Sequence, residues 1–289
     1  MNIGVFILLL ISVISCSSIY DVDKSIIREV EETMQEIEHN EICFFFTDPH
    51  FDSSHSNFYD YLQVLKEHKY LFPEASCICG GDWLINNDTN EEAINKLYEI
   101  NQNLYNLLGC DYYPVLGNHD TNYQGRFNVG SEINSGFITN DEIVSLLFDR
   151  FNSTYYTFKN QSIRYFVLDT GIDWEPQLHP FRLGQIEWLA KKLSINEDDY
   201  IVVIMHIYKN DADNTNPEPF AAEIMQLSES FNKRECASYN GINYDFSSVK
   251  GKVLCFLCGH THLDFIDETH SIPVIGTTHF KENNVPTFD

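Results

Sequence analysis

Basic side chains are scarce in this chain of 289 residues. Lys and Arg number 18 against 43 Asp and Glu, which gives a formal net charge of -25. An excess of negative charge of this size repels a polyphosphate backbone, so the composition argues against a nucleic-acid-binding protein. Most of the carboxylates are expected on a solvated acidic surface.

The sequence also lacks an apolar run long enough to span a membrane comfortably. An apolar stretch from Gly4 to Ile14 is interrupted only by Ser12, and charged sequence begins soon after Tyr20. This stretch is shorter than the roughly 20 residues of a membrane-spanning helix. Small residues follow it, so residues 1–18 are expected to be a signal peptide and the chain to be secreted or sent to a lysosome-like compartment. A buried N-terminal strand or helix is the alternative.

Three Asn-x-Ser/Thr triplets fit a route through a eukaryotic secretory pathway. Triplets of this kind accept N-linked glycans there, so the chain is expected to be a glycoprotein. The acceptor residues are Asn87, Asn152 and Asn160.

The sequence also lacks any Pro/Gly/Ser-rich linker, low-complexity segment or internal repeat that would divide it. Hydrophobic residues make up 43% of the chain and aromatic residues 14%, which is typical of a packed globule. The sequence therefore predicts a single domain over residues 19–289.

Short runs rich in β-branched and aromatic residues alternate with amphipathic stretches, which favours a layered α/β architecture. Thr89 and Gly109 flank one predicted helix, and Thr139 with Glu142 forms a capping-box pattern at the start of another. The predicted strands are 42–47, 76–80, 112–116, 163–168, 201–205 and 253–257, and the predicted helices are 57–69, 91–108, 141–151, 183–193 and 219–231.

The chain has eight cysteines, and seven remain if Cys16 leaves with the signal peptide, so at least one is unpaired or pairs with another molecule. Cys110 and Cys236 lie in less regular stretches and are the better disulfide candidates. The others lie in or beside apolar strand-like runs, where a thiol acts as a small hydrophobic group. The expected buried free thiols are Cys43, Cys77, Cys79, Cys255 and Cys258.

Polar groups follow the predicted strands immediately. The carboxyl ends of strands in an α/β sheet converge, so side chains far apart in sequence can share one site there. The candidate ligands are two carboxylates, one amide oxygen and four imidazoles, which suit first-row metals, and no thiolate is among them. In chain order the groups are Asp48-Pro49-His50, Gly80-Gly81-Asp82, Gly117-Asn118-His119-Asp120, His206 and Gly259-His260-Thr261-His262.

Spacing adds a geometric expectation. In an extended segment Asp48 and His50 would point to the same side, and the same holds for His260 and His262. The glycines that precede three of the candidate ligands allow tight turns and a close approach of the backbone to a ligand.

Together the five groups resemble the signature of the calcineurin-like metallophosphoesterases: D-x-H, G-D, G-N-H-[DE], a strand ending in His, and G-H-x-H. The match runs from Asp48 to His262. The resemblance implies an α/β fold, namely a four-layer α/β/β/α sandwich of two mixed β-sheets flanked by helices. It also implies a centre of two divalent metal ions (Mn, Fe, Zn or Mg).

The resemblance implies a role for each position. Asp82 would bridge both ions, and a hydroxide shared between them would attack the phosphorus. His119 would lie over the substrate phosphate as the candidate general acid, with Asp120 expected to orient its ring. The first ion would be held by Asp48, His50 and His262, and the second by Asn118, His206 and His260.

Two differences from the motifs of other metallophosphoesterases narrow the choice of family branch. Protein serine/threonine phosphatases carry Asp-Arg-Gly soon after the bridging Asp, whereas Trp-Leu-Ile-Asn-Asn follows Asp82 here. Purple acid phosphatases place a Tyr three residues after that Asp, where this chain has Ile85. Neither of these branches is therefore expected.

The expected activity is hydrolysis of a phosphate monoester of a small substrate. The alternative is a phosphodiesterase acting on a cyclic nucleotide or a phospholipid headgroup, similar to a sphingomyelinase. In that case Trp83, Tyr123 and the polar loop 210–219 would contact the second ester arm, although each also fits an ordinary rim or core position. A third reading is a secreted metal-binding or carbohydrate-associated scaffold without activity, against which the complete ligand set argues.

Overall fold

The chain is described here by a computed structural model. The predicted signal peptide, Asn87, Tyr123 and most of the polar loop lie outside the described residues. No helix within the described part is both long and apolar enough to cross a membrane. The structure describes residues 43–51, 62, 63, 65, 66, 69, 70, 72–85, 89–122, 138–170, 179–198, 200–209 and 216–277.

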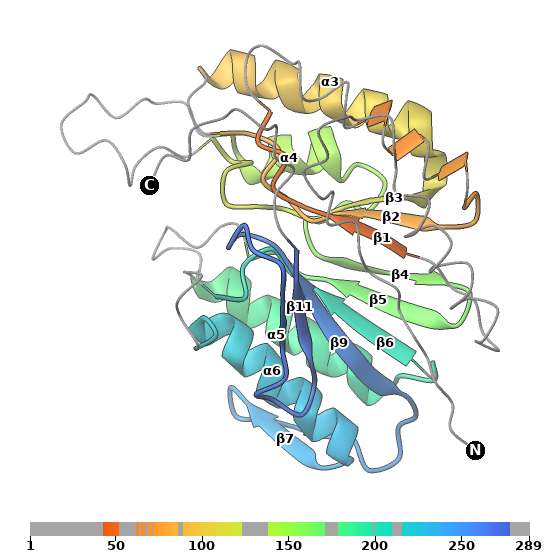
Figure 1. Cartoon of the computed structure of the whole chain (residues 1–289). Helices are drawn as coiled ribbons and strands as arrows, with labels where there is room; N and C mark the ends of the chain where they lie inside the picture. The colour runs from red at the N-terminus through yellow and green to blue at the C-terminus, as the bar shows by residue number, and fades with distance from the viewer. Residues whose placement is uncertain are drawn as a thin grey trace.

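Four layers make up the fold (Figure 1). Helices α3 (Asn90–Leu108) and α4 (Asn140–Leu147) cover a small sheet, which packs on a larger sheet covered in turn by α5 (His179–Ser194) and α6 (Pro219–Lys233). The predicted α/β/β/α sandwich is therefore confirmed. Of the predicted helix 57–69, only residues 62, 63, 65, 66 and 69 are described, and they are helical.

The small sheet has the order β1-β2-β3, and its described strands all run parallel. The larger sheet has the order β10-β11-β9-β6-β5-β4 and is mixed, because its outer strands β4 and β10 run antiparallel to their neighbours. The small sheet consists of β1 (Cys43–Phe46), β2 (Ser76–Cys79) and β3 (Tyr112–Pro114), the last preceded by a 3-10 turn (Gly109–Asp111). The larger sheet consists of β4 (Tyr156–Asn160), β5 (Ile163–Val167), β6 (Tyr200–Ile204), β9 (Lys252–Cys258), β10 (Phe265–Asp267) and β11 (Val274–Gly276).

Burial of both faces of the central strand β6 explains why its sequence is a continuous apolar run. Val202 and Ile204 enter the core between the two sheets, whereas Ile201 and Val203 enter the core beneath α5 and α6. Successive side chains of a strand point to opposite faces, so a strand buried on both faces needs apolar residues at every position. All four side chains are fully buried.

Several strands escaped the sequence-based prediction. β4, β10 and β11 are short or lie at a sheet edge, where apolar periodicity is weak. β7 (Cys236–Tyr239) and β8 (Ile242–Asp245) form a separate antiparallel hairpin. Asn240 and Gly241 connect them, both at positive φ (48° and 75°), and the Asn-Gly pair was a usable hairpin signal.

The predicted helix caps are present. The Thr139 side chain accepts a hydrogen bond from the backbone N–H of Glu142, whose carboxylate accepts one from the Thr139 N–H, and Thr89 makes the same reciprocal pair at the start of α3. Helix α4 ends at Leu147, earlier than predicted, because the chain turns at Phe148 and buries that ring.

The five cysteines expected as buried thiols are buried, and Cys77, Cys255 and Cys258 are free. Burial raises the pKa of Cys77 and of Cys255 to about 12. The disulfide expectation is wrong for Cys236, which is a free and exposed thiol on the β7–β8 hairpin, and the side chain of Cys110 lies outside the described residues.

Candidate metal centre

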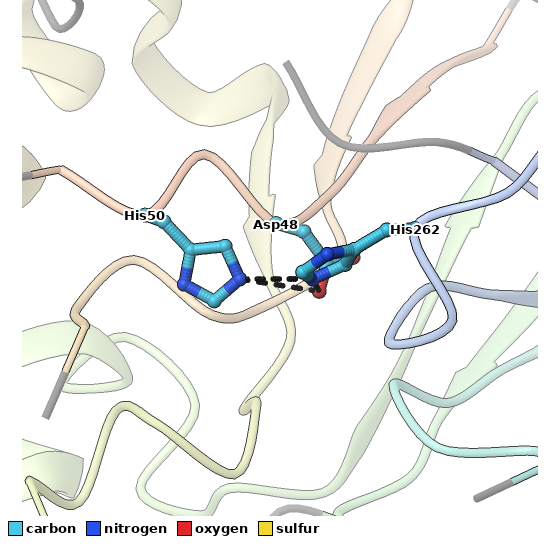
Figure 2. Close-up of side chains that lie close together, drawn as sticks. All are labelled: Asp48, His50 and His262. Atoms are coloured by element: carbon cyan, nitrogen blue, oxygen red, sulfur yellow. Dashed lines mark hydrogen bonds and ion pairs between the residues drawn. The ribbon is translucent and has the colours of Figure 1, made fainter. Parts of the chain in front are cut away.

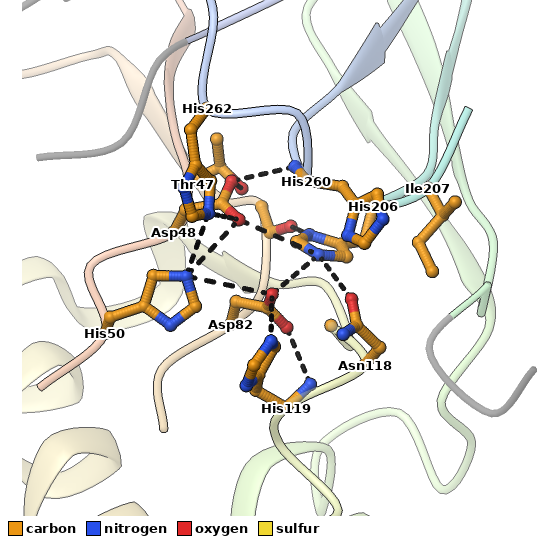
Figure 3. A network of polar contacts seen from close by, with 12 residues as sticks. Thr47, Asp48, His50, Asp82, Asn118, His119, His206, Ile207, His260 and His262 are labelled. Atoms are coloured by element: carbon orange, nitrogen blue, oxygen red, sulfur yellow. Dashed lines mark hydrogen bonds and ion pairs between the residues drawn. The ribbon is translucent and has the colours of Figure 1, made fainter. Parts of the chain in front are cut away.

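The loops that follow β1, β2, β3, β6 and β9 meet at one end of the sandwich (Figure 3). Backbone hydrogen bonds join them: the Asp48 N–H donates to the Gly81 carbonyl oxygen at 2.9 Å, and the Gly259 N–H donates to the His206 carbonyl oxygen at 3.0 Å. The His260 N–H donates to Asp48 Oδ2 at 2.9 Å and links the two sheets. The predicted convergence at the strand ends is therefore observed.

Two groups of side chains have the arrangement of a metal site. Asp48, His50 and His262 each offer one ligand atom, and these three atoms lie within 4.8 Å of one another (Figure 2). The second group has the same compactness and consists of Asp82, His206 and His260. The first group contains the three residues expected to hold the first ion, and the second contains His206 and His260, expected to hold the second ion, together with Asp82.

Asn118 and Asp82 both contact Nε2 of His206. Asn118 Oδ1 is 3.1 Å from His206 Nε2, and Asp82 Oδ2 is 3.0 Å from the same nitrogen. Asp82 Oδ2 also lies 3.9 Å from His50 Nε2, which belongs to the other group. One carboxylate oxygen therefore faces ligand atoms of both groups, as a bridging residue must.

The backbone geometry differs from the extended conformation expected from the spacing. Asp48 and His50 have φ values of 54° and 45°, and His260 and His262 have 70° and 55°. Asp82 is also at positive φ, 59°. The Asp48 and His50 side chains enter the same group, whereas His260 and His262 enter different groups. The chain turns at all of these ligands, and such backbone strain is a feature of functional sites.

Two glycines permit the close approach of these loops. A Cβ at Gly117 would collide with the backbone nitrogen and carboxylate of Asp82, and one at Gly259 would collide with Thr47 and the Asp48 carboxylate. The expectation that glycines beside the ligands serve close approach is confirmed at these positions.

The carboxylates of Asp48 and Asp82 each accept hydrogen bonds through one oxygen atom, and the second oxygen atom remains available to a further partner. Asp48 Oδ2 accepts hydrogen bonds from Thr47 Oγ1 (2.7 Å) and from the His260 N–H. Asp82 Oδ1 accepts one from the His119 N–H at 2.8 Å. Asp48 Oδ1 and Asp82 Oδ2 are buried without a well-formed hydrogen bond, which is the condition that a bound cation satisfies.

Two histidines are oriented by backbone carbonyl groups. His206 Nδ1 lies 2.7 Å from the Gly80 carbonyl oxygen, and His50 Nδ1 lies 3.0 Å from the Leu84 carbonyl oxygen. A carbonyl oxygen can only accept, so both Nδ1 atoms carry the proton and both Nε2 atoms are available as ligands. His50 Nε2 and His262 Nε2 are 3.0 Å apart and meet beside Asp48 Oδ1.

The electrostatics of the cluster favour a cation. Burial disfavours charge on Asp48, yet His206 and His262 outweigh it and lower the pKa of Asp48 to about 2. Burial likewise opposes charge on His206, but Asp82 and Asp48 raise its pKa to about 10. A cluster that attracts a proton this strongly attracts a metal cation for the same reason, and the oxygen and nitrogen donors fit such an ion.

His50 and His260 favour the neutral form that metal ligation requires. Burial, followed by the neighbouring His206, lowers the pKa of His260 to about 4. Burial also lowers the pKa of His50. Both rings are thus neutral donors at neutral pH.

His119 lies at the edge of the cluster with its side chain 25% exposed, and its Nε2 is 3.8 Å from Asp82 Oδ2. Its ring meets His50 edge to face, with the centroids 4.9 Å apart. Nδ1 of His119 is buried and makes no hydrogen bond. Nε2 is therefore the nitrogen that faces the metal site.

Asp120 has a different role from the one expected. It does not orient the His119 ring, because both carboxylate oxygens accept hydrogen bonds from backbone N–H groups. Oδ1 accepts from Trp83 (2.6 Å) and Leu84 (3.4 Å), and Oδ2 accepts from Gly117 (2.8 Å) and Asp82 (3.1 Å). Asp120 therefore fixes the loop that carries Asp82 against the loop that carries Asn118.

Trp83 is fully buried, and its ring stacks on Phe51 and meets Phe46 edge to face. Trp83 is therefore a core residue, which confirms one of the two interpretations of the sequence, and it does not line a substrate entrance. Thr47, in contrast, was missed by sequence reasoning. A hydroxyl residue before an Asp carries no signal by itself, and its role is visible only once Thr47 Oγ1 is seen to bind Asp48 Oδ2.

Comparisons with known proteins agree with this geometry. The family model described as calcineurin-like phosphoesterase matches residues 44–264. The chain is similar to the structure of a dimetal phosphatase from Danio rerio, with a TM-score of 0.52 and 12% identity over 81% of this chain and 86% of that chain. At this identity the likeness shows a shared fold. A search of curated proteins found no match.

Two further solved structures are more distant. A phosphopantetheinyl hydrolase from Mycobacterium tuberculosis has a TM-score of 0.44 and 9% identity, covering 82% of this chain and 89% of that chain. The anchor in the inner membrane complex of Plasmodium has a TM-score of 0.43 and 15% identity, covering 81% of this chain and 70% of that chain.

Replacing Asp120 tests its role in fixing the two loops. Asp120→Asn places an NH2 group against buried backbone donors, so the free energy of unfolding is expected to fall by about 1–3 kcal/mol. Urea unfolding of the metal-free protein measures this change. The control is Asp111→Asn in a half-exposed ion pair with Lys69, expected to cost less than about 1 kcal/mol. Equal effects of both variants would contradict the assigned role.

Proposed function

Because the chain belongs to the calcineurin-like phosphoesterase family and is a metal-dependent phosphoester hydrolase, we propose that it hydrolyses phosphate monoesters of small substrates with two divalent ions. The observation that carries the proposal is the pair of compact ligand groups joined by the buried Asp82 carboxylate. The high negative charge of the chain favours a small substrate over a polyanion.

Asp48, His50 and His262 would hold the first ion, Asn118, His206 and His260 would hold the second, and Asp82 would contribute to both. The donors are oxygen and imidazole nitrogen, which admit Mn, Fe, Zn or Mg. Two bound ions at such a site lower the pKa of water and neutralise charge on the phosphoryl oxygens.

The residues of the chain supply orientation and a proton. The Gly80 and Leu84 carbonyl groups hold the rings of His206 and His50 in the ligating tautomer. His119 Nε2 faces the cluster, and we assign it as the donor of a proton to the leaving alkoxide. Asp120 contributes by fixing the backbone of the ligand loops and takes no part in proton transfer.

The substrate class is tested by comparing p-nitrophenyl phosphate with bis-p-nitrophenyl phosphate, using protein of measured metal content with and without added Mn²⁺. Metal-dependent cleavage that favours the monoester is expected, and His206→Ala is expected to lose both metal and activity. Preference for the diester would favour the phosphodiesterase alternative. A protein that binds two ions and cleaves neither compound would contradict the proposal.

His119→Ala is expected to retain both ions and to hydrolyse an alkyl phosphate about a hundredfold more slowly, the usual effect of losing a general acid. Hydrolysis of p-nitrophenyl phosphate should fall less, because its leaving group needs little protonation. Metal analysis and turnover with both substrates measure these effects. Near-normal turnover of the alkyl phosphate would remove His119 from the mechanism.

The proposal extends to secretion with a glycan on Asn152. Asn152 is exposed in a turn, whereas the Asn160 side-chain amide donates to Ser76 Oγ at 2.7 Å and is partly buried. Expression of the full chain in a eukaryotic secretory host should give secreted protein of glycosidase-sensitive mass. Asn152→Gln should remove one glycan, and Asn160→Gln should leave the glycosidase-sensitive mass unchanged. Unglycosylated protein retained in the cytosol would contradict both parts.

A further inference from the structure

The loop that carries His260 and His262 is well fixed at its start. The preceding Gly259 N–H donates to the His206 carbonyl oxygen at 3.0 Å, and the His260 N–H donates to Asp48 Oδ2 at 2.9 Å. Beyond this point the loop reaches the surface: the His262 side chain is 41% exposed, and the next two residues are exposed as well. Besides the contacts of its ring with His50 and Asp48, the position of His262 therefore depends on what holds the chain after it.

An ion pair holds this downstream segment. Asp267, on β10, has Oδ2 only 2.6 Å from Lys209 Nζ, and the two side chains are 8% and 12% exposed. Asp267 Oδ1 accepts hydrogen bonds from the N–H and hydroxyl groups of Thr269, at 3.0 and 2.6 Å. Lys209 Nζ also lies 5.0 Å from the centre of the Phe265 ring, at the start of β10. Both ends of β10 thus contact one side chain.

Lys209 is itself fixed relative to the metal centre. It lies three residues after His206, and the segment between them is held by the Ile207 N–H, which donates to Thr170 Oγ1 at 2.7 Å. The intervening Tyr208 side chain is buried beneath the larger sheet. Lys209 therefore transmits the rigid placement of His206 to β10.

The surroundings of Asp267 favour its ionised form. Burial opposes ionisation of Asp267, but hydrogen bonds from Lys209 and Thr269 outweigh it and lower the pKa of Asp267 to about 2. A largely desolvated ion pair with its remaining hydrogen bonds satisfied has a defined geometry, and removal of either charge leaves the other without its partner.

We propose that Lys209 and Asp267 form a positioning pair that sets the place of His262 and thereby the affinity for one of the two metal ions. The affected ion is the one assigned to Asp48, His50 and His262. The other ion is insensitive, because His206 is fully buried and its ring is held by the Gly80 carbonyl oxygen. This inference rests on the proposed two-metal function.

Calorimetric titration of the metal-stripped full chain with Mn²⁺ tests the pair. Lys209→Met keeps an unbranched stem near Phe265 and removes the charge. Its dissociation constant for one ion is expected to rise by about 10- to 100-fold, the usual effect of removing an outer-shell partner, while the other ion binds as in the wild type. Lys209→Arg, which retains a cation, should stay closer to the wild type.

Asp267→Asn keeps acceptor capacity for Thr269 and gives a second, milder variant in case Lys209→Met does not fold. The matched control is Lys69→Met, which removes a 2.7 Å ion pair with Asp111 and should leave both affinities unchanged. Unchanged binding, or equal weakening of both ions, in the folded variants would overturn the positioning role alone. A wild-type protein that takes up no Mn²⁺ would overturn the two-metal proposal and this inference with it.

Discussion

Two carboxylates buried at the junction of two sheets set the conditions for the rest of this site. Asp48 and Asp82 are 0% and 1% exposed, and neither has a lysine or arginine among its ion-pair partners within the described residues. Buried negative charge without compensation is strongly unfavourable. Imidazoles from four loops provide part of the compensation, and the open oxygen atoms leave the remainder to cations. The sandwich brings the two sheets together where this compensation can occur.

The sequence, with the family resemblance that its motifs carry, was sufficient for the layers and for the convergence of candidate ligands at one edge. Apolar runs such as that of β6 predict central strands, because burial on both faces demands apolar residues throughout. Residues directly after such strands must gather at one edge, which brings Asp48 and His262 together although 214 positions separate them along the chain. Short edge strands such as β10 and β11 were missed, since three residues carry too little periodicity to be recognised.

The sequence was insufficient for the contacts that support the ligands. Asp120 stands beside His119 in the chain, which suggested that it orients that ring, but its carboxylate accepts from four backbone donors, three in the loop after β2 and one at Gly117 in its own loop. Likewise, nothing in the sequence links Thr47 to a role at Asp48 or Lys209 to Asp267. Such partners are chosen by three-dimensional proximity and by the need to satisfy buried polar groups, and neither can be read from local spacing.

The left-handed backbone at five of the candidate ligands has a consequence for how the site tolerates change. Among non-glycine residues, Asn, Asp and His enter this conformation most readily, and these are also the residue types that serve here as ligands. The residue type at each position is thus constrained both by ligation of the cation and by the left-handed main-chain conformation. Exchange of Asp for Glu or of His for Gln would preserve a donor atom and still oppose the turn, so chemically conservative replacements are not conservative for the architecture of this centre.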